Sequence, residues 1–210
     1  MMTTTVKEHP ILFSGPMVLA ILNGKKTQTR RVIKDQPPVG FLPWSDSATN
    51  GALCRIFTDE GRSYPEAKVS WTCRCPYGVP GNRLWVKETF QEVDDSDEYK
   101  VRLGPIYRAD ADDLGPWVPS IFMPRKYSRI TLEIVSVRVQ RVQEISEEDA
   151  EAEGVERCGP GNGEGFHGPT VAELYRWGYR NGWNAINAKR GFSWDKNPWV
   201  WVIEFKRVTD

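Results

Sequence analysis

The segment at residues 128–142 limits the fold more than any other part of the sequence. From Ile130 to Ile134, apolar residues alternate with polar ones, which is the pattern of a half-buried β-strand. The alternation resumes in the opposite phase at Val137, so one residue near Val135 is extra and predicts a β-bulge. Bulges bend strands, and a small barrel needs bent strands in order to close. The segment therefore predicts a long, bent strand in a β-rich domain.

Other strands are predicted on both sides of this segment, at residues 25–33, 83–88 and 199–205. Strands outnumber the predicted helices and are not interleaved with them one for one, which argues against a doubly wound parallel sheet. We therefore predict an α+β fold, built on a small, partly open β-barrel with helices packed on it. In the last strand, alternate residues place four large side chains on one face: Trp199, Trp201, Ile203 and Phe205.

Three helical segments accompany the predicted strands. The first begins after Ser14, which is a good cap, and has Pro16 in its first turn, where proline is favoured. It ends at Gly24. The second, at residues 147–153, begins with a sequence that resembles a capping box. The third follows a similar capping sequence that starts at Thr170.

The chain has 210 residues, which is the length of one globular domain. Residues 36–82 contain many prolines and glycines and show no sustained period, so they are predicted to form an insertion or a long loop. A second, glycine-rich loop is predicted at residues 159–168. We therefore predict a single domain over residues 1–210 with loop insertions near 36–80 and 155–170.

The charge balance bears on the kind of partner. The 28 Lys and Arg residues cancel the 28 Asp and Glu residues, so the field of the whole molecule does not attract a polyanion and any nucleic-acid surface must be a local patch. No apolar run approaches the roughly 18 to 20 residues of a membrane-spanning helix, and residues 1–10 lack the apolar stretch of a signal peptide. We expect no membrane partner and a cytoplasmic location. Four cysteines are too few for a disulfide scaffold.

A cluster of positive charge lies in residues 25–34, directly after the predicted helix end at Gly24. One interpretation is a solvated strand edge, because charged residues protect exposed edges from aggregation. The other interpretation is a site for an anion or a nucleotide. The five cations are Lys25, Lys26, Arg30, Arg31 and Lys34.

The spacing of the cysteines does not favour a zinc site. Cys73 and Cys75 are separated by one residue, whereas paired zinc ligands are usually two to four residues apart. The remaining candidate ligands, Cys54, Cys158 and His167, are scattered along the chain. We predict that the protein binds no metal and needs no cofactor.

Residues 21–31, with the sequence ILNGKKTQTRR, resemble the Gly-x-Lys-Thr-x-Thr-x-Arg signature of the ASCH domains, which are related to the PUA RNA-binding domains. Residues 80–86 are similar to the strand start that follows Gly-Asp in this family, with Asn82 where Asp is usual. Residues 145–154 resemble its short acidic helix, and residues 199–205 its last barrel strand. The resemblance implies a PUA-like barrel. Together with residues 123–125 and 187–191, these segments resemble the long ASCH proteins found in bacteriophages and prophages.

The resemblance also implies a reaction. One branch of the ASCH family comprises small amidohydrolases that remove the acetyl group from N4-acetylcytidine with a Lys, a Thr and a Glu. These roles fall on Lys26 as base, Thr29 as nucleophile and Glu153 as proton donor. A lysine serves as a base only if burial or cationic neighbours lower its pKa. Strict strand alternation would place Lys26 and Thr29 on opposite faces, so the turn after Gly24 must include Lys26 and redirect it.

Lys25, Arg30 and Arg31 are the predicted contacts to substrate or RNA, because a planar guanidinium can hold a phosphate or a base edge. A small nucleoside is therefore one expected partner. An alternative function is RNA binding, with ribonuclease activity as in some ASCH relatives. A third is a phage accessory protein that binds another protein through the insertion. The sequence leaves the oligomeric state open.

Overall fold

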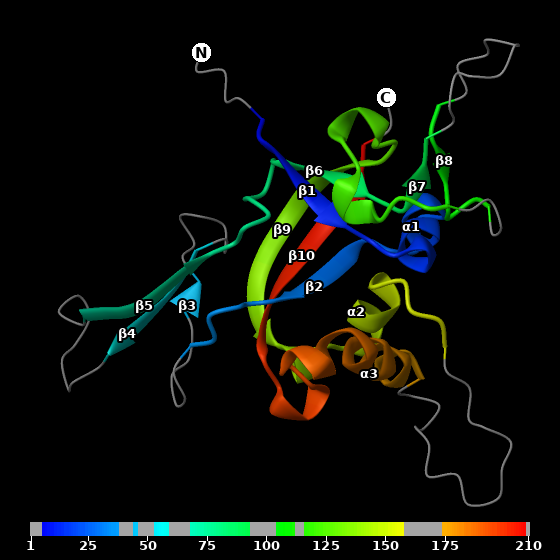
Figure 1. Ribbon diagram of the computed structural model, residues 1–210. Coiled ribbons are helices and arrows are strands. Elements are labelled where there is room, and N and C mark those ends of the chain that lie inside the picture. Colours follow the sequence, from blue (N-terminus) through cyan, green and yellow to red (C-terminus); the bar gives the residue numbers. More distant parts are fainter. Residues whose placement is uncertain are drawn as a thin grey trace, which may run out of the picture.

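The computed structural model describes residues 6–37, 44–45, 53–58, 68–92, 104–111, 116–157 and 174–208, and for residues 44–45, 53–58 and 68–71 the backbone alone. The domain has the predicted α+β composition (Figure 1). The main sheet has five strands in the order β1-β6-β9-β10-β2, of which β1 and β6 are parallel and the other pairs antiparallel. Their bounds are β1 Glu8–Leu12, β6 Arg83–Lys87, β9 Thr131–Arg141, β10 Trp199–Arg207 and β2 Gln28–Val32.

The α-helices of the described chain are α1 (Gly15–Leu22), α2 (Glu147–Ala152) and α3 (Leu174–Asn187). Ser14 and Ser146 occupy the cap positions of α1 and α2, but only the Ser146 side chain makes the cap hydrogen bond, which it accepts from the Asp149 N–H. The predicted start of the third helix, at residues 170–173, lies outside the described residues. Short 3₁₀ turns complete the helical structure: Ser120–Phe122, Arg125–Tyr127, Val142–Glu144, Ala188–Arg190 and Trp194–Lys196.

The prediction of a long loop at residues 36–82 was wrong in part. This stretch contains a separate three-stranded antiparallel sheet, which extends to the left of the main sheet in Figure 1. The signal for it was present, since Val69, Trp71 and Cys73 alternate with polar residues. The strands are β3 (Trp44–Ser45), β4 (Leu53–Thr58) and β5 (Lys68–Arg74); a two-stranded ribbon, β7 (Phe90–Gln91) with β8 (Ile106–Tyr107), lies elsewhere in the chain. The second predicted insertion lies largely outside the described residues.

The β-bulge predicted in the long strand is confirmed. In the pairing of β9 with β10, Glu204 lies opposite Ser136 and Phe205 opposite Ile134, so Val135 has no partner. Val135 is 51% exposed. The bulge bends β9 (Figure 1) and reverses which of its residues face the interior on either side of Val135.

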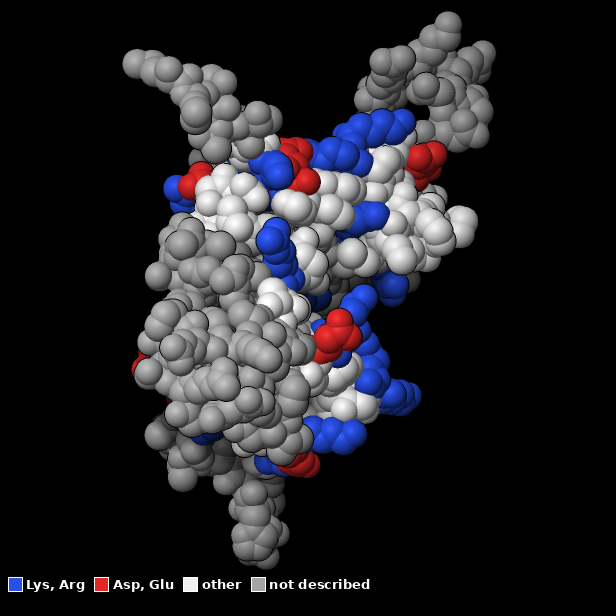
Figure 2. Space-filling view, turned by 90° about the vertical axis from the view of Figure 1, so that its left-hand side faces the viewer, with Lys and Arg blue, Asp and Glu red and all other residues white. Residues whose placement is uncertain are grey.

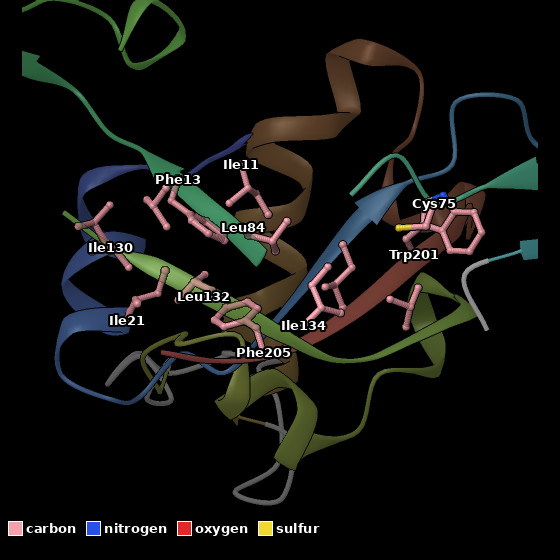
Figure 3. Close-up of a cluster of buried hydrophobic side chains, with 14 of the residues drawn as sticks. Ile11, Phe13, Ile21, Cys75, Leu84, Ile130, Leu132, Ile134, Trp201 and Phe205 are labelled. Atoms are coloured by element: carbon pink, nitrogen blue, oxygen red, sulfur yellow. The ribbon is translucent and has the colours of Figure 1, made fainter. Parts of the chain in front are cut away.

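The last strand is buried on both faces, whereas the sequence predicted one apolar face. Trp201 and Phe205 belong to a core cluster on one face of the sheet, with Leu84 of β6 and Leu132 of β9 (Figure 3). The side chains on its other face, Val200 and Val202, belong to a second cluster formed with α2 and α3. Its members from these two helices are Ala150, Tyr179 and Trp183. The two helices therefore cover the face that the sequence pattern left unassigned.

The two edge strands of the main sheet approach each other. The Arg31 Nη2 on β2 donates a hydrogen bond of 2.6 Å to the backbone carbonyl of Leu12 on β1. These strands stand at opposite ends of the strand order, so the sheet must curl to bring them together. In the part of the chain that the structure describes, no helix is both long and apolar enough to cross a membrane.

Replacing Val202 with Ala tests the second core. Val202 is fully buried between the sheet and the helices, so we expect the free energy of unfolding to fall by about 2 kcal/mol through lost burial and a residual cavity. The matched control is Val135→Ala in the exposed bulge, for which a change within about 0.5 kcal/mol is expected. Urea denaturation of both variants measures the difference, and equal losses would contradict the assignment.

Candidate functional site

A tight turn directs Lys26 into the interior. Gly24 has a φ of 70°, and the N–H groups of Lys25 and Lys26 both donate to the carbonyl of Ala20, at 2.9 and 3.0 Å. Strand β2 begins only at Gln28, so Lys26 precedes it and is not subject to strand alternation. The geometric condition that the sequence imposed is met: Lys26 is 2% exposed, while Lys25 is on the surface.

The buried Lys26 ammonium is paired with Glu153. Its Nζ lies 2.6 Å from Glu153 Oε2 and donates further hydrogen bonds of 2.8 Å to the backbone carbonyls of Glu153 and Gln28. An ammonium has three N–H groups, so these three acceptors satisfy it completely. Burial lowers the pKa of Lys26, opposed by the Glu153 carboxylate and reinforced by Arg31 and Arg30.

Helix α2 and the turn after α1 bring the two partners together. Glu153 is the C-cap residue of α2, and the Ala152 carbonyl accepts a hydrogen bond of 2.9 Å from the Thr27 N–H. Gly154 follows with a φ of +75°, and a Cβ atom there would lie 2.8 Å from Ala20 Cβ and 2.9 Å from Lys26 Cβ. The end of α2 therefore rests directly on the turn that carries Lys26.

Arg30 is the second buried cation of the site, and it is also paired. Its Nη2 lies 2.6 Å from Asp149 Oδ2, its Nη1 donates to Gln28 Oε1, and Gln28 Nε2 donates to Asp149 Oδ1 at 3.0 Å. Burial alone would raise the pKa of the Asp149 carboxyl, but hydrogen bonds from Gln28 and Arg30 and the charge of Arg138 hold it below its usual value. Arg30 therefore orders the site rather than facing solvent.

A cavity of about 430 Å³ adjoins this network. Thr29, Arg30, Arg31 and Glu153 line it, as do apolar side chains of α1, β2 and α3. Lys26 is not among the lining residues, but it is bonded to the Gln28 carbonyl, which belongs to the peptide that leads to Thr29. One wall of the cavity is formed by α3, and it was not predicted from the sequence. The signal for it is that the lining residues recur every four positions, which places them on one face of the helix. Its lining residues are Gly178, Tyr179, Gly182, Trp183, Ile186 and Asn187.

Several polar atoms of the cavity wall have no hydrogen-bond partner among the described residues. They are Glu153 Oε1, Arg30 Nε and Arg31 Nε, and each is buried. Tyr179 lies near Glu153, and burial raises the pKa of its phenol well above the usual value, with the negative charge of Glu153 acting in the same direction. A polar ligand could supply the missing hydrogen bonds only after the cavity wall moves, because protein atoms cover all three.

A second buried carboxylate shows that the free oxygen of Glu153 is not general in this fold. Both oxygens of Glu88, which is 1% exposed, accept hydrogen bonds of 2.9 Å from Arg129. Asp110 contacts the same guanidinium from the other side. Glu153 is 6% exposed, yet only its Oε2 is bonded, with Arg30 Nη1 3.8 Å from Oε1. The hydrogen-bond partners therefore distinguish the two carboxylates. Glu88 is fully bonded and does not line the cavity, whereas Glu153 is bonded at one oxygen and does line it.

The structure brings together most of the residues predicted from the sequence. Lys26 and Glu153 are in contact, and Thr29, Arg31 and Glu153 line one cavity. Lys25 is exposed and does not line it. Within the described residues, no group of three or more His, Cys, Asp or Glu side chains could hold a metal ion, while Cys158 and His167 lie outside those residues.

Comparison of the chain with models of protein families, with curated proteins and with solved structures finds no match. The site is therefore interpreted from its own geometry and from the motif at residues 21–31.

Substituting Ala for Gly154 tests the contact between α2 and the turn. The new Cβ would meet Ala20 and Lys26 and would also hold an unfavourable φ, so we expect the free energy of unfolding to fall by roughly 3 kcal/mol. Gly24→Ala is the control, because its φ of +70° is as unfavourable but its Cβ meets nothing within 4 Å. It should lose only about 1 kcal/mol. Chemical denaturation compares the two, and equal losses would show that the contact is unimportant.

Replacing one partner of the ion pair should cost more than replacing both. Lys26→Met leaves the Glu153 carboxylate buried without its principal partner, so a loss of about 3 to 5 kcal/mol is expected. Adding Glu153→Gln to that variant removes the unpaired charge and should restore at least about 1 kcal/mol. Lys25→Met, at the exposed neighbour, should change stability by less than about 0.5 kcal/mol. Additive losses in the double variant would argue against coupling.

Proposed function

We propose that this protein is an ASCH-type amidohydrolase that removes an acyl group from the exocyclic amine of an acylated cytosine or cytidine. The observation that carries the proposal is the buried pair of Lys26 and Glu153 at the wall of a cavity that Thr29 also lines. The motif at residues 21–31 supplies the roles of base, nucleophile and acid. The proposal includes a PUA-like barrel, which the hydrogen bond between the edge strands at Arg31 and Leu12 supports.

The ion pair offers a way to prepare both the base and the acid. Transfer of one proton across the 2.6 Å hydrogen bond from Lys26 Nζ to Glu153 Oε2 gives a neutral amine and a neutral carboxylic acid. Burial favours this form, because it disfavours charge and lowers the pKa of Lys26. The amine is then the base, and the carboxylic acid is the proton donor, without a change in total charge.

The reaction then has two stages. Lys26 takes the Thr29 hydroxyl proton as Oγ1 bonds to the acyl carbon, and Glu153 gives its proton to the departing ring amine as the C–N bond breaks. Glu153 then takes a proton from water as the water oxygen bonds to the acyl carbon, and Lys26 returns its proton to Thr29 Oγ1 as the ester C–O bond breaks and the acid product leaves. The base role requires Lys26 Nζ to exchange its hydrogen bond with the Gln28 carbonyl for one with the adjacent Thr29 hydroxyl.

The alternative, an RNA-binding module or ribonuclease, depends on free cations along the motif. Lys26 and Arg30 are held in buried ion pairs, which leaves Lys25 and Arg31 of the four cations between residues 25 and 31 for phosphate contacts. A cavity of about 430 Å³ fits a small molecule. Both observations favour a small substrate over a long RNA.

Incubation of the purified full chain with N4-acetylcytidine tests the proposal, with cytidine and acetate measured by chromatography. We expect turnover by the native protein, and a loss of at least about 10³-fold in kcat/KM for Thr29→Val, which removes only the nucleophile. Thr27→Val is the matched control, since Thr27 is exposed and does not line the cavity.

Two results would contradict the proposal. One is the absence of turnover by the native protein. The other is full activity of Thr29→Val beside an equally active Thr27→Val. Circular dichroism of each variant establishes that it is folded.

A further inference from the structure

Among the charged side chains that line the cavity, positive charges outnumber negative ones. Two of them are neutralised, Glu153 by Lys26 at 2.6 Å and Arg30 by Asp149 at 2.6 Å. Among the residues whose side chains are described, no carboxylate lies within ion-pair distance of the remaining lining cations. These cations are Arg31, Lys34 and Arg190.

Arg31 is fixed in position but retains free donors. Its guanidinium lies over the Phe13 ring, 5.1 Å from the ring centroid, and its Nη2 bonds to the Leu12 carbonyl. Its Nε is buried without a partner among the described residues. A ligand at the cavity would therefore meet an oriented cation, with little side-chain entropy left to lose.

Arg190 is oriented from the opposite wall. Its Nη1 donates to Asn187 Oδ1 at 3.3 Å, and Asn187 Nδ2 donates to the Trp183 carbonyl at 3.2 Å. All three residues line the cavity. Figure 2 shows Lys and Arg side chains gathered along the right-hand side of the molecule, beside a notch in its outline.

From this arrangement we infer that the cavity binds a phosphate monoester through Arg31, Lys34 and Arg190. The inference rests on the proposed function and extends it: the natural substrate is an acylated cytidine nucleotide, not the neutral nucleoside. Guanidinium groups match the geometry of phosphate oxygens, and a dianionic phosphate suits three cations that have no carboxylate partner in the described part of the chain. Because the chain has no net charge, this local excess must supply the attraction.

Calorimetric titration of the full-length Thr29→Val variant tests the inference, because this variant keeps the Lys26–Glu153 pair and is expected to bind without turning over. The probes are cytidine, cytidine 5′-monophosphate and a short single-stranded RNA that has no terminal phosphate, at one fixed ionic strength. We expect the monophosphate to bind about tenfold more tightly than cytidine. Adding Arg190→Gln or Lys34→Gln should remove most of that preference. Adding Lys189→Gln should not, because Lys189 is an exposed neighbour that does not line the cavity.

Equal affinity for cytidine and its monophosphate would overturn the inference, as would a preference that survives both Arg190→Gln and Lys34→Gln. Tighter binding of the RNA than of the monophosphate, lost in Arg190→Gln, would also overturn it and would favour an RNA ligand. Turnover of N4-acetylcytidine and of its 5′-monophosphate by the native protein is measured separately. Turnover without a preference for the monophosphate contradicts only the inferred phosphate site. A preference for the monophosphate without turnover contradicts only the proposed hydrolase activity.

Discussion

The contact between Lys26 and Glu153 determines how the site is built. It joins residues 127 positions apart, and it holds the end of α2 against the turn after α1. Such a pair is expensive to bury, and it persists only when its remaining hydrogen bonds are made. Lys26 meets this requirement with three acceptors, while Glu153 meets it at only one oxygen. The unsatisfied oxygen is buried within a residue that lines the cavity, so the interaction that closes the structure also leaves one polar atom without a partner beside the cavity.

The second core explains why there is a cavity beside this pair. Val200 and Val202 of β10 face α2 and α3, so apolar contacts on this face of the sheet hold the two helices against it. Strand β10 also pairs with β2. Tyr179 and Trp183 of α3 line the cavity together with Thr29 and Glu153. The polar network of Arg30 then lies between the sheet and α2, where its charges are paired. Packing positions the walls, and the ion pairs determine which polar atoms face inward.

The parts predicted correctly from the sequence depend on local pattern. The bulge at Val135 followed from a break in alternation, and the turn at Gly24 followed from a motif in which glycine ends a helix. The parts that were missed depend on contacts between distant segments. Burial on both faces of β10 requires α3, and nothing within residues 199–205 indicates which element will cover the second face. The roles of Arg30 and Asp149 were likewise hidden, because an ion pair between residues 119 positions apart leaves no periodic signal.

The glycines of α3 connect this packing to the use of the cavity. Gly178 and Gly182 lie one helical turn apart, and both line it. A helix interior is less stable with glycine than with alanine by about 1 kcal/mol at each position. At Gly182 the fold does not require glycine, since a Cβ there would meet no atom within 4 Å and the backbone is not left-handed. The space beside Gly182 therefore has no packing role in the described structure, and a ligand that reached the free oxygen of Glu153 would have this wall of α3 open to it.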